Sequence, residues 1–152
     1  MKKFKFKLKS GVTNFKNIRW APVLNCAVKY KSKILIVKRS KSMRLYPGYW
    51  NGISGFLDDR KSLEEKVYEE LREELRIGRR DIISITIGKI FDQEAPKYEK
   101  TWIVHPVLVK IKTNRIKLDW EAEDYKWIKP REANSFKLLP GFDLVLRNLS
   151  LT

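Results

Sequence analysis

Several residue types that mark familiar classes of protein are scarce in this chain of 152 residues. The single cysteine, Cys26, excludes an internal disulfide, and the single histidine, His105, excludes a zinc site built only from protein ligands. No apolar run approaches the roughly 20 residues of a membrane-spanning helix, and the basic N-terminus lacks the apolar segment of a signal peptide. We therefore expect a cytoplasmic protein without a membrane segment, whose chemistry uses carboxylate, lysine, arginine and aromatic side chains.

Acidic residues are also few relative to basic ones. The chain has 33 lysines and arginines against 18 aspartates and glutamates, a net charge of +15, and the acids concentrate between residues 55 and 77. A strongly positive surface attracts polyanions and steers phosphorylated ligands through its long-range field. RNA is therefore one candidate partner, and the alternative is that the charge serves solubility alone.

The composition that remains is typical of a globular protein, with 43% hydrophobic and 34% charged residues. The length suits one domain over residues 1–152, and no repeat, linker or low-complexity segment divides it. Within residues 1–20, lysines alternate with Phe4, Phe6 and Leu8, which indicates either a strand with one apolar face or a basic arm. Residues 11–19 have the polar character of a connector.

Alternating apolar residues predict most of the strands. The expected strands are 23–30, 34–38, 81–91, 101–111, 116–118 and 124–128, with a turn at 31–33, a loop at 92–100, a helical turn at 130–133 and a helix at 142–149. Pro106 predicts an edge position or a bulge in its strand, because proline cannot donate to a sheet ladder. His105 falls among apolar neighbours and is expected to be structural.

One helix is predicted to begin near Leu63. Ser62 followed by Glu65 has the form of a capping box, in which side chains satisfy the free N–H groups of the first helical turn. An isolated helix of this length is marginal in water, so packing against a core must stabilise it. The expected apolar stripe recurs every four residues at Leu63, Val67, Leu71 and Leu75.

Beside that stripe, Glu70, Glu73 and Glu74 fall within roughly 100° of one another around the helix. Like charges three or four residues apart repel, and the repulsion grows when the side chains are half buried. A hard cation such as Mg²⁺ prefers carboxylate and carbonyl oxygens and would remove the repulsion. The alternative interpretation is an acidic helix face exposed to water.

The stretch GFLDDRKSLEEKVYEELREELRI resembles the Nudix box, the loop and helix of the pyrophosphate hydrolases, written G-x5-E-x7-R-E-U-x-E-E-x-G-U with U a bulky aliphatic residue. Six positions match without a gap, namely Gly55, Glu70, Leu71, Glu73, Glu74 and Ile77. The resemblance extends over roughly residues 23–149, but only the box is specific to the family.

Three positions depart from the pattern: Lys61 replaces the first glutamate, Glu69 the arginine, and Arg76 the second glycine. The first two departures exchange signs, so we predict that the family's contact between glutamate and arginine survives here in reverse, between Lys61 and Glu69. The third predicts that the helix continues one or two residues further, toward Gly78 as its left-handed cap.

The resemblance implies an α/β fold, a Nudix-type α/β/α sandwich with a mixed β-sheet. It also implies a Mg²⁺-dependent pyrophosphohydrolase, with Mn²⁺ as a possible replacement. The metal ligands would be Glu70, Glu73, Glu74 and the backbone carbonyl of Ser54. Glu70 and Glu73 are the predicted catalytic residues, and a later acid remains possible as the general base, namely Glu94, Glu121 or Glu123, although an ordinary acidic turn is favoured for the last two.

For substrate binding, the resemblance points to Arg39 near phosphate, Trp50 as a stacking or core residue, and Gly55. The expected substrates are nucleoside diphosphates linked to another group: ADP-ribose, a dinucleoside polyphosphate, a nucleoside triphosphate or an RNA 5′ end. The alternative is a Nudix-like module that binds nucleotide or RNA with little or no hydrolysis. Isomerase activity on isopentenyl diphosphate is disfavoured, because the surroundings of Cys26 do not match that class. Assembly as a homodimer is possible.

Overall fold

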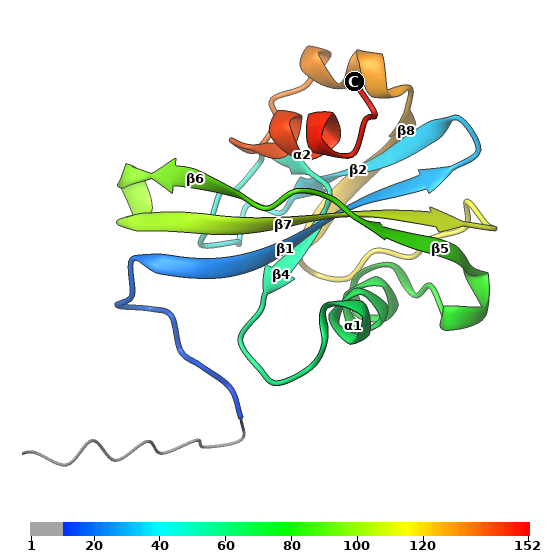
Figure 1. Cartoon of the computed structure of the whole chain (residues 1–152). Helices are drawn as coiled ribbons and strands as arrows, with labels where there is room; N and C mark the ends of the chain where they lie inside the picture. The colour runs from blue at the N-terminus through cyan, green and yellow to red at the C-terminus, as the bar shows by residue number, and fades with distance from the viewer. Residues whose placement is uncertain (1–10) are drawn as a thin grey trace, which may run out of the picture.

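The computed structural model describes residues 11–152, in which a mixed β-sheet lies between two helical layers (Figure 1). The predicted strand or arm at residues 1–8 lies outside the described residues. The strands are β1 (Trp20–Tyr30), β2 (Lys33–Arg39), β3 (Trp50–Asn51), β4 (Ile53–Phe56), β5 (Ile82–Ile87), β6 (Phe91–Ala95), β7 (Lys100–Ile111) and β8 (Ala122–Ile128). The helices are α1 (Leu63–Leu75) and α2 (Phe142–Asn148), with short 3₁₀ turns at Arg79–Asp81, Pro96–Tyr98 and Pro130–Ser135.

The sheet is organised around β1 and β7, which run parallel to each other, whereas the other pairs of strands are antiparallel. The strand order is β3-β2-β1-β7-β5, with β4 paired to β1, β6 to β7 and β8 to β2. Helix α1 covers one face and α2 covers the other, as Figure 1 shows. The predicted α/β/α sandwich with a mixed sheet is therefore confirmed.

Side chains of β1 alternate between two apolar cores, one on each face of the sheet. Ala21 and Ala27 belong to the core beneath α2, and Leu24, Cys26 and Val28 to the core beneath α1. The predicted helix stripe supplies the other half of the second core, because Val67, Leu71 and Leu75 are fully buried. This burial holds α1 against β1 and β4.

Helix α1 begins as predicted but ends earlier. The Ser62 hydroxyl accepts the Glu65 backbone N–H at 3.1 Å, and the helix stops at Leu75. Arg76, not Gly78, takes the left-handed conformation, with φ of 59° against −86° for Gly78. Ile77 then donates its N–H back to the Leu71 carbonyl at 3.2 Å and is buried in the core. The prediction of a longer helix was wrong because burying Ile77 requires the chain to turn back at Arg76.

The strands predicted at 23–30, 34–38, 101–111 and 124–128 are confirmed with small changes at their ends. The predicted strand at 81–91 is shorter, since β5 ends at Ile87. The predicted loop at 92–100 contains β6 and a 3₁₀ turn. Strand β6 pairs only with β7 among the described strands, so its polar sequence lacks the alternation of a buried strand.

No strand forms at 116–118. Instead Lys117 donates its N–H to the Leu75 carbonyl at 3.0 Å, and Ile116 and Leu118 pack on the core beneath α1. The apolar residues there cover a helix end without joining a ladder. The predicted helical turn at 130–133 and the terminal helix are both present.

Pro106 lies in a central strand, so the predicted edge position or bulge was wrong. On one side it lies opposite Asn25 of β1. On the other side the partner of β7 changes at this point, from β6 along Lys100–Val104 to β5 along Val107–Ile111. The Pro106 carbonyl accepts the Gly88 N–H at 2.8 Å on that side. The missing N–H therefore falls where the ladder is already interrupted.

Among residues 11–152, none of the helices has the length and apolar character that crossing a membrane requires. His105 is half buried, and its Nδ1 lies 3.1 Å from the Ile103 carbonyl and 3.3 Å from that of Val23. These contacts agree with the expected structural role.

Candidate active site

The predicted box brings one glutamate of α1 against the backbone of β4. Strand β4 pairs with β1, placing Ser54 opposite Asn25 and Gly55 opposite Leu24. A Cβ atom at Gly55 would lie only 2.6 Å from Glu70 Oε1. Glycine is required here because the Glu70 carboxylate occupies the space of a side chain. The carboxylate is thereby held next to the Ser54–Gly55 segment.

Glu74, one helical turn further, shares this site with Glu70. Its Oε2 atom is inaccessible to water and has no hydrogen-bond partner. Burial raises the pKa of Glu74 well above 4.5, and the adjacent Glu70 carboxylate raises it further. Burial also raises the pKa of Glu70, although a hydrogen bond with Glu74 opposes this shift. Glu73 differs from both, because its side chain is exposed.

A third acid, Glu121, reaches the same two glutamates from the other end of the sequence. It precedes β8, whose Ala122 lies opposite Arg39 of β2, and its carbonyl accepts the Ser40 N–H at 2.8 Å. The negative charge of Glu121 contributes to the raised pKa of Glu70 and Glu74. Glu121 lies in a turn, as the interpretation favoured from sequence expects, and its charge also acts on the two box carboxylates.

The other two later acids lie in ion pairs of their own. Glu94 is 3.5 Å from Arg19 Nη2 and also accepts the Thr101 hydroxyl, and Glu123 is 3.5 Å from Lys38 Nζ. Neither lines the cavity described next. Of the three acids considered as a later general base, the structure brings Glu121 to the box carboxylates.

A cavity of about 400 Å³ lies on the α2 side of the sheet; Glu121 lines it, whereas Glu70 and Glu74 do not, and Glu70 lies against Gly55 of its lining. The cavity wall is largely apolar and aromatic, and its polar lining includes the predicted site residues Arg39, Ser54 and Gly55 together with Glu121. The apolar lining includes Val23, Phe56, Trp102, Val104, Leu139 and Val145. A mostly apolar pocket with a few convergent polar groups is typical of a small-molecule site.

Two buried asparagines in this cavity were not identified from the sequence. Asn25 Nδ2 donates to Asn51 Oδ1 at 3.0 Å, and Asn51 Nδ2 donates to Ser54 Oγ at 3.2 Å. The chain of amides fixes β1 and β3 against β4 at the floor of the cavity. A polar residue at position 25 inside an otherwise apolar strand is the signal that could have indicated it.

Arg39 and Trp50 end in different surroundings. Arg39 lines the cavity, and its Nε donates to the Leu45 carbonyl at 2.8 Å. Burial lowers the pKa of Arg39, and the charges of Glu121 and Glu74 oppose this shift. Trp50 is not among the residues lining the cavity and packs edge to face on Phe136, with ring centroids 5.4 Å apart. Its position agrees with core packing, the more common fate expected for it.

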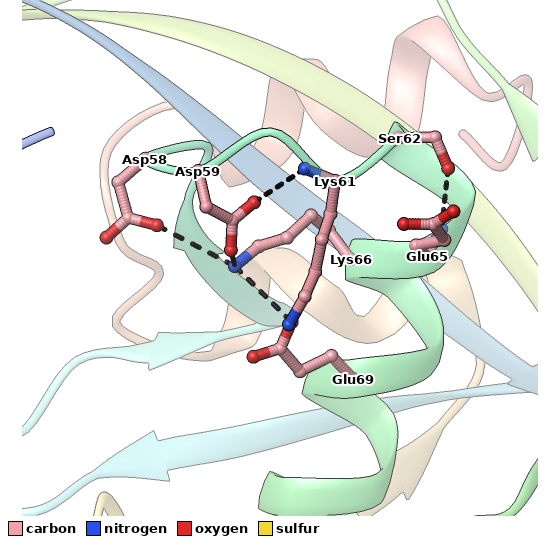
Figure 2. A network of polar contacts seen from close by, with 7 residues as sticks. All are labelled: Asp58, Asp59, Lys61, Ser62, Glu65, Lys66 and Glu69. Atoms are coloured by element: carbon pink, nitrogen blue, oxygen red, sulfur yellow. Dashed lines mark hydrogen bonds and ion pairs between the residues drawn. The ribbon is translucent and has the colours of Figure 1, made fainter. Parts of the chain in front are cut away.

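The loop that precedes α1 is tied to the helix by ion pairs, drawn in Figure 2. Lys61 Nζ lies 2.6 Å from Glu69 Oε2, so the contact predicted from the exchanged signs is confirmed. Lys66, a buried lysine that the sequence did not single out, lies between the two elements. Its Nζ is 3.1 Å from Asp59, 3.6 Å from Glu69 and 3.7 Å from Asp58.

The donor atoms at this site fit a hard divalent cation. Glu70, Glu74 and Glu121 offer carboxylate oxygens, the type that Mg²⁺ and Mn²⁺ prefer, and the buried Glu74 Oε2 lacks any partner. In their present orientations, no three acidic, histidine or cysteine side chains within residues 11–152 are close enough together to bind a metal ion. The glutamate side chains would have to rotate to surround an ion.

The box, cavity and sheet order agree with comparisons to known proteins. The family model of the NUDIX domain matches residues 20–149. The nucleoside triphosphatase NudI of Escherichia coli is 26% identical over 112 residues, which cover 68% of this chain and 78% of that protein. The MutT protein from Methanosarcina mazei has a similar structure, with a TM-score of 0.71, 21% identity, and coverage of 88% of this chain and 96% of that one.

A further similar structure is the bifunctional NMN adenylyltransferase/ADP ribose pyrophosphatase from Francisella tularensis, complexed with AMP and a Mn ion. Its TM-score is 0.68 at 20% identity, and the match covers 86% of this chain and 41% of that one. The chain belongs to the NUDIX domain family. Within it, the family match and the similarity to a nucleoside triphosphatase place the chain among the Nudix hydrolases, enzymes of the pyrophosphohydrolase class.

Proposed function

We propose that this chain hydrolyses the pyrophosphate linkage of a nucleoside diphosphate derivative with the help of Mg²⁺ or Mn²⁺. The observation that carries the proposal is the group of Glu70, Glu74 and Glu121 beside an apolar cavity that also contains Arg39. Three carboxylates in one partly buried place repel one another strongly unless protons or cations neutralise them. A phosphorylated substrate and a divalent cation together supply the matching charges.

Glu70 and Glu74 would hold the ion, and the Ser54 carbonyl and Glu73 are the further ligands implied by the family pattern. A bound divalent ion neutralises diphosphate charge and lowers the pKa of an attacking water. Gly55 keeps Glu70 against β4, and the ion pairs of Lys66 hold the preceding loop on the helix. The protein thereby orients its ligands before the substrate arrives.

Arg39 is proposed to contact substrate phosphate, because a planar guanidinium binds phosphate oxygens in pairs. Its hydrogen bond to the Leu45 carbonyl fixes the side chain at the cavity wall. The apolar wall formed by Trp102, Val104 and Val145 suits a nucleobase. Nucleoside triphosphates and ADP-ribose are the first substrates to test, since they are named for proteins similar to this chain.

Glu70, Glu73 and Glu121 are the candidates for the general base. Glu70 lies close to the carboxylates of Glu74 and Glu121. Glu73 is exposed on α1, and Glu121 lines the cavity. General bases typically contribute between a hundredfold and ten-thousandfold to the rate. Replacing Glu73 and Glu121 one at a time with glutamine should therefore show whether either is the base. The variant that lacks the base is expected to lose about a hundredfold to ten-thousandfold in kcat with little change in KM.

The test of the proposed function follows the hydrolysis of nucleoside triphosphates, ADP-ribose and dinucleoside polyphosphates with Mg²⁺ or Mn²⁺, by separating and quantifying the nucleotide products on an ion-exchange column. The native chain is compared with Glu74→Gln and with the control Glu65→Gln, which changes an exposed acid of the same helix. We expect Glu74→Gln to lose turnover and Glu65→Gln to retain it. Nucleotide binding without turnover in the native chain would instead indicate a binding module.

A further inference from the structure

One end of the sheet collects basic residues from three separate segments of the chain. These segments are residues 29–33 in the β1–β2 turn, 76–81 between α1 and β5, and 110–117 after the end of β7. Together they contain ten lysines and arginines and one acid, Asp81. Figure 1 shows the three connections at the same end of the molecule. We call these three segments the basic end.

Backbone contacts confirm that the segments adjoin one another. Lys29 of β1 lies directly opposite Lys110 of β7. The Lys112 N–H donates to the Asp81 carbonyl at 2.8 Å, and the Lys117 N–H donates to the Leu75 carbonyl at 3.0 Å, next to Arg76. The ten cations therefore form one surface even though up to 88 positions of sequence separate them.

The mutual repulsion of these cations lowers the stability of the folded protein, and no carboxylate among the described residues forms an ion pair with them. Like charges directly opposite each other on neighbouring strands, such as Lys29 and Lys110, are destabilising. Nine of the ten are exposed, all except Lys29: Lys31, Lys33, Arg76, Arg79, Arg80, Lys110, Lys112, Arg115 and Lys117. The charges are available to an external anion.

Most of the basic end lies away from the carboxylate site, although Arg76 follows Glu74 by two residues. Lys29 lies four residues beyond Asn25 along β1, which corresponds to about 13 Å at the rise of a strand. No residue of the three segments lines the cavity beside Glu70 and Glu121. A substrate diphosphate bound at the carboxylates would therefore not account for these cations.

We propose that the basic end binds the phosphate backbone of a single-stranded nucleic acid. Its cations continue around the end of the sheet. Lys29 and Lys110 share the α2 face with Ala27 and Leu108, whereas Arg79 packs over the ring of Tyr68 on α1 at 4.1 Å. A flexible polyanion can follow such a curved surface, but a planar membrane can meet only one side of it.

The test compares the full native chain with a variant in which Lys31, Lys33, Lys110 and Lys112 are all changed to glutamine. The control changes four exposed lysines elsewhere, Lys16, Lys89, Lys97 and Lys137, so that both variants carry the same net charge. Binding is measured by fluorescence anisotropy with single-stranded RNA and DNA of about 20 nucleotides, longer than most single-strand sites. The measurement is repeated over a range of salt concentrations, and with vesicles containing anionic lipid.

We expect the basic-end variant to lose at least tenfold in affinity for RNA or DNA, and the control to lose clearly less. The slope of log affinity against log salt should become shallower by up to about three for the four cations removed. Equal affinity for RNA and DNA would indicate recognition of the phosphate backbone. A higher affinity for RNA would indicate additional contacts to the ribose. Equal losses in both variants, or retained binding in both, would overturn the proposal. Binding to vesicles but not to either nucleic acid would also overturn it.

Hydrolysis provides an independent readout. The four lysines of the basic-end variant lie outside the carboxylate site, so its turnover of a small nucleotide should equal that of the native chain. Nucleic-acid binding should likewise survive Glu74→Gln, which removes a carboxylate of the proposed metal site. Failure of the proposed hydrolysis and failure of the proposed nucleic-acid surface are therefore distinguishable.

Discussion

Lys61 and Glu69 form an ion pair of 2.6 Å that joins the loop before α1 to the second turn of that helix. The Nudix pattern places the opposite charges at these two positions. The charges have been exchanged and the contact has been kept, which indicates that the link between loop and helix matters more than the sign at either end. Lys66 strengthens the link from beneath, since its Nζ lies 3.6 Å from the same Glu69 carboxylate.

Exchanging this pair should be tolerated better than reversing either charge alone. The order of thermal unfolding temperatures is expected to be native, then the double variant Lys61→Glu with Glu69→Lys, then Lys61→Glu, then Glu69→Lys. The last is worst because it would place three lysines together at Lys61, Lys66 and position 69. A double-mutant cycle of unfolding temperatures checks this. A double variant no better than Glu69→Lys would show that the pair does not interact.

Gly55→Ala should disable the site while leaving the fold intact. The new methyl group would meet Glu70 Oε1 at 2.6 Å and Cδ at 2.8 Å, so the Glu70 carboxylate must move away from β4. We expect the affinity for Mn²⁺ to fall by about 10–100-fold, the range typical when support of a metal ligand is lost. Isothermal titration with Mn²⁺ measures it. Gly78→Ala is the matched control, because no atom lies within 4 Å of a Cβ there.

The metal-free protein should lose stability as the pH rises above about 4.5, the ordinary pKa of glutamate. Burial raises the pKa of Glu74 in the folded protein, so the folded state binds its proton more tightly than the unfolded state does. The stability that the bound proton of Glu74 contributes is complete below the pKa of the unfolded state. It is lost as the pH rises through the pKa of the folded state. The loss is about 1.4 kcal/mol for each unit by which the two pKa values differ.

Denaturant unfolding in EDTA between pH 4 and pH 8 measures this decline. Glu74→Gln should flatten the curve and be more stable than the native chain at pH 7, whereas Glu65→Gln should retain the decline. Adding Mg²⁺ to the native chain should restore stability at pH 7, because a ligand that binds only the folded state stabilises it. A native curve that rises with pH in EDTA would contradict a raised pKa for the buried Glu74.

Arg76→Gly should stabilise the protein. Arg76 has φ of 59° and ψ of 33°, a left-handed conformation that costs a residue with a side chain about 1–2 kcal/mol. Glycine avoids this cost but loses more entropy on folding, so a net gain of roughly 0.5–1 kcal/mol is expected. Urea unfolding measures the gain. Arg72→Gly, inside the same helix, should have the opposite sign and cost about 1 kcal/mol.

Local patterns were sufficient for much of the fold. The spacing of Val67, Leu71 and Leu75 identified the buried face of α1, and Ser62 identified its first turn. These signals are local, because a helix brings residues four apart onto one face whatever surrounds it. Strand β6 was not predicted, because its sequence is polar and its hydrogen bonds depend on pairing with β7.

The sequence by itself determined the carboxylate-bearing helix, the glycine before it and the exchanged charges of Lys61 and Glu69. Only the tertiary structure brought Glu121 to Glu74, buried Lys66 between the loop and the helix, and placed Arg76 in the left-handed cap. The reason is physical. Glu121 reaches the site through the pairing of β8 with β2, a contact between residues about 80 positions apart that no local periodicity encodes.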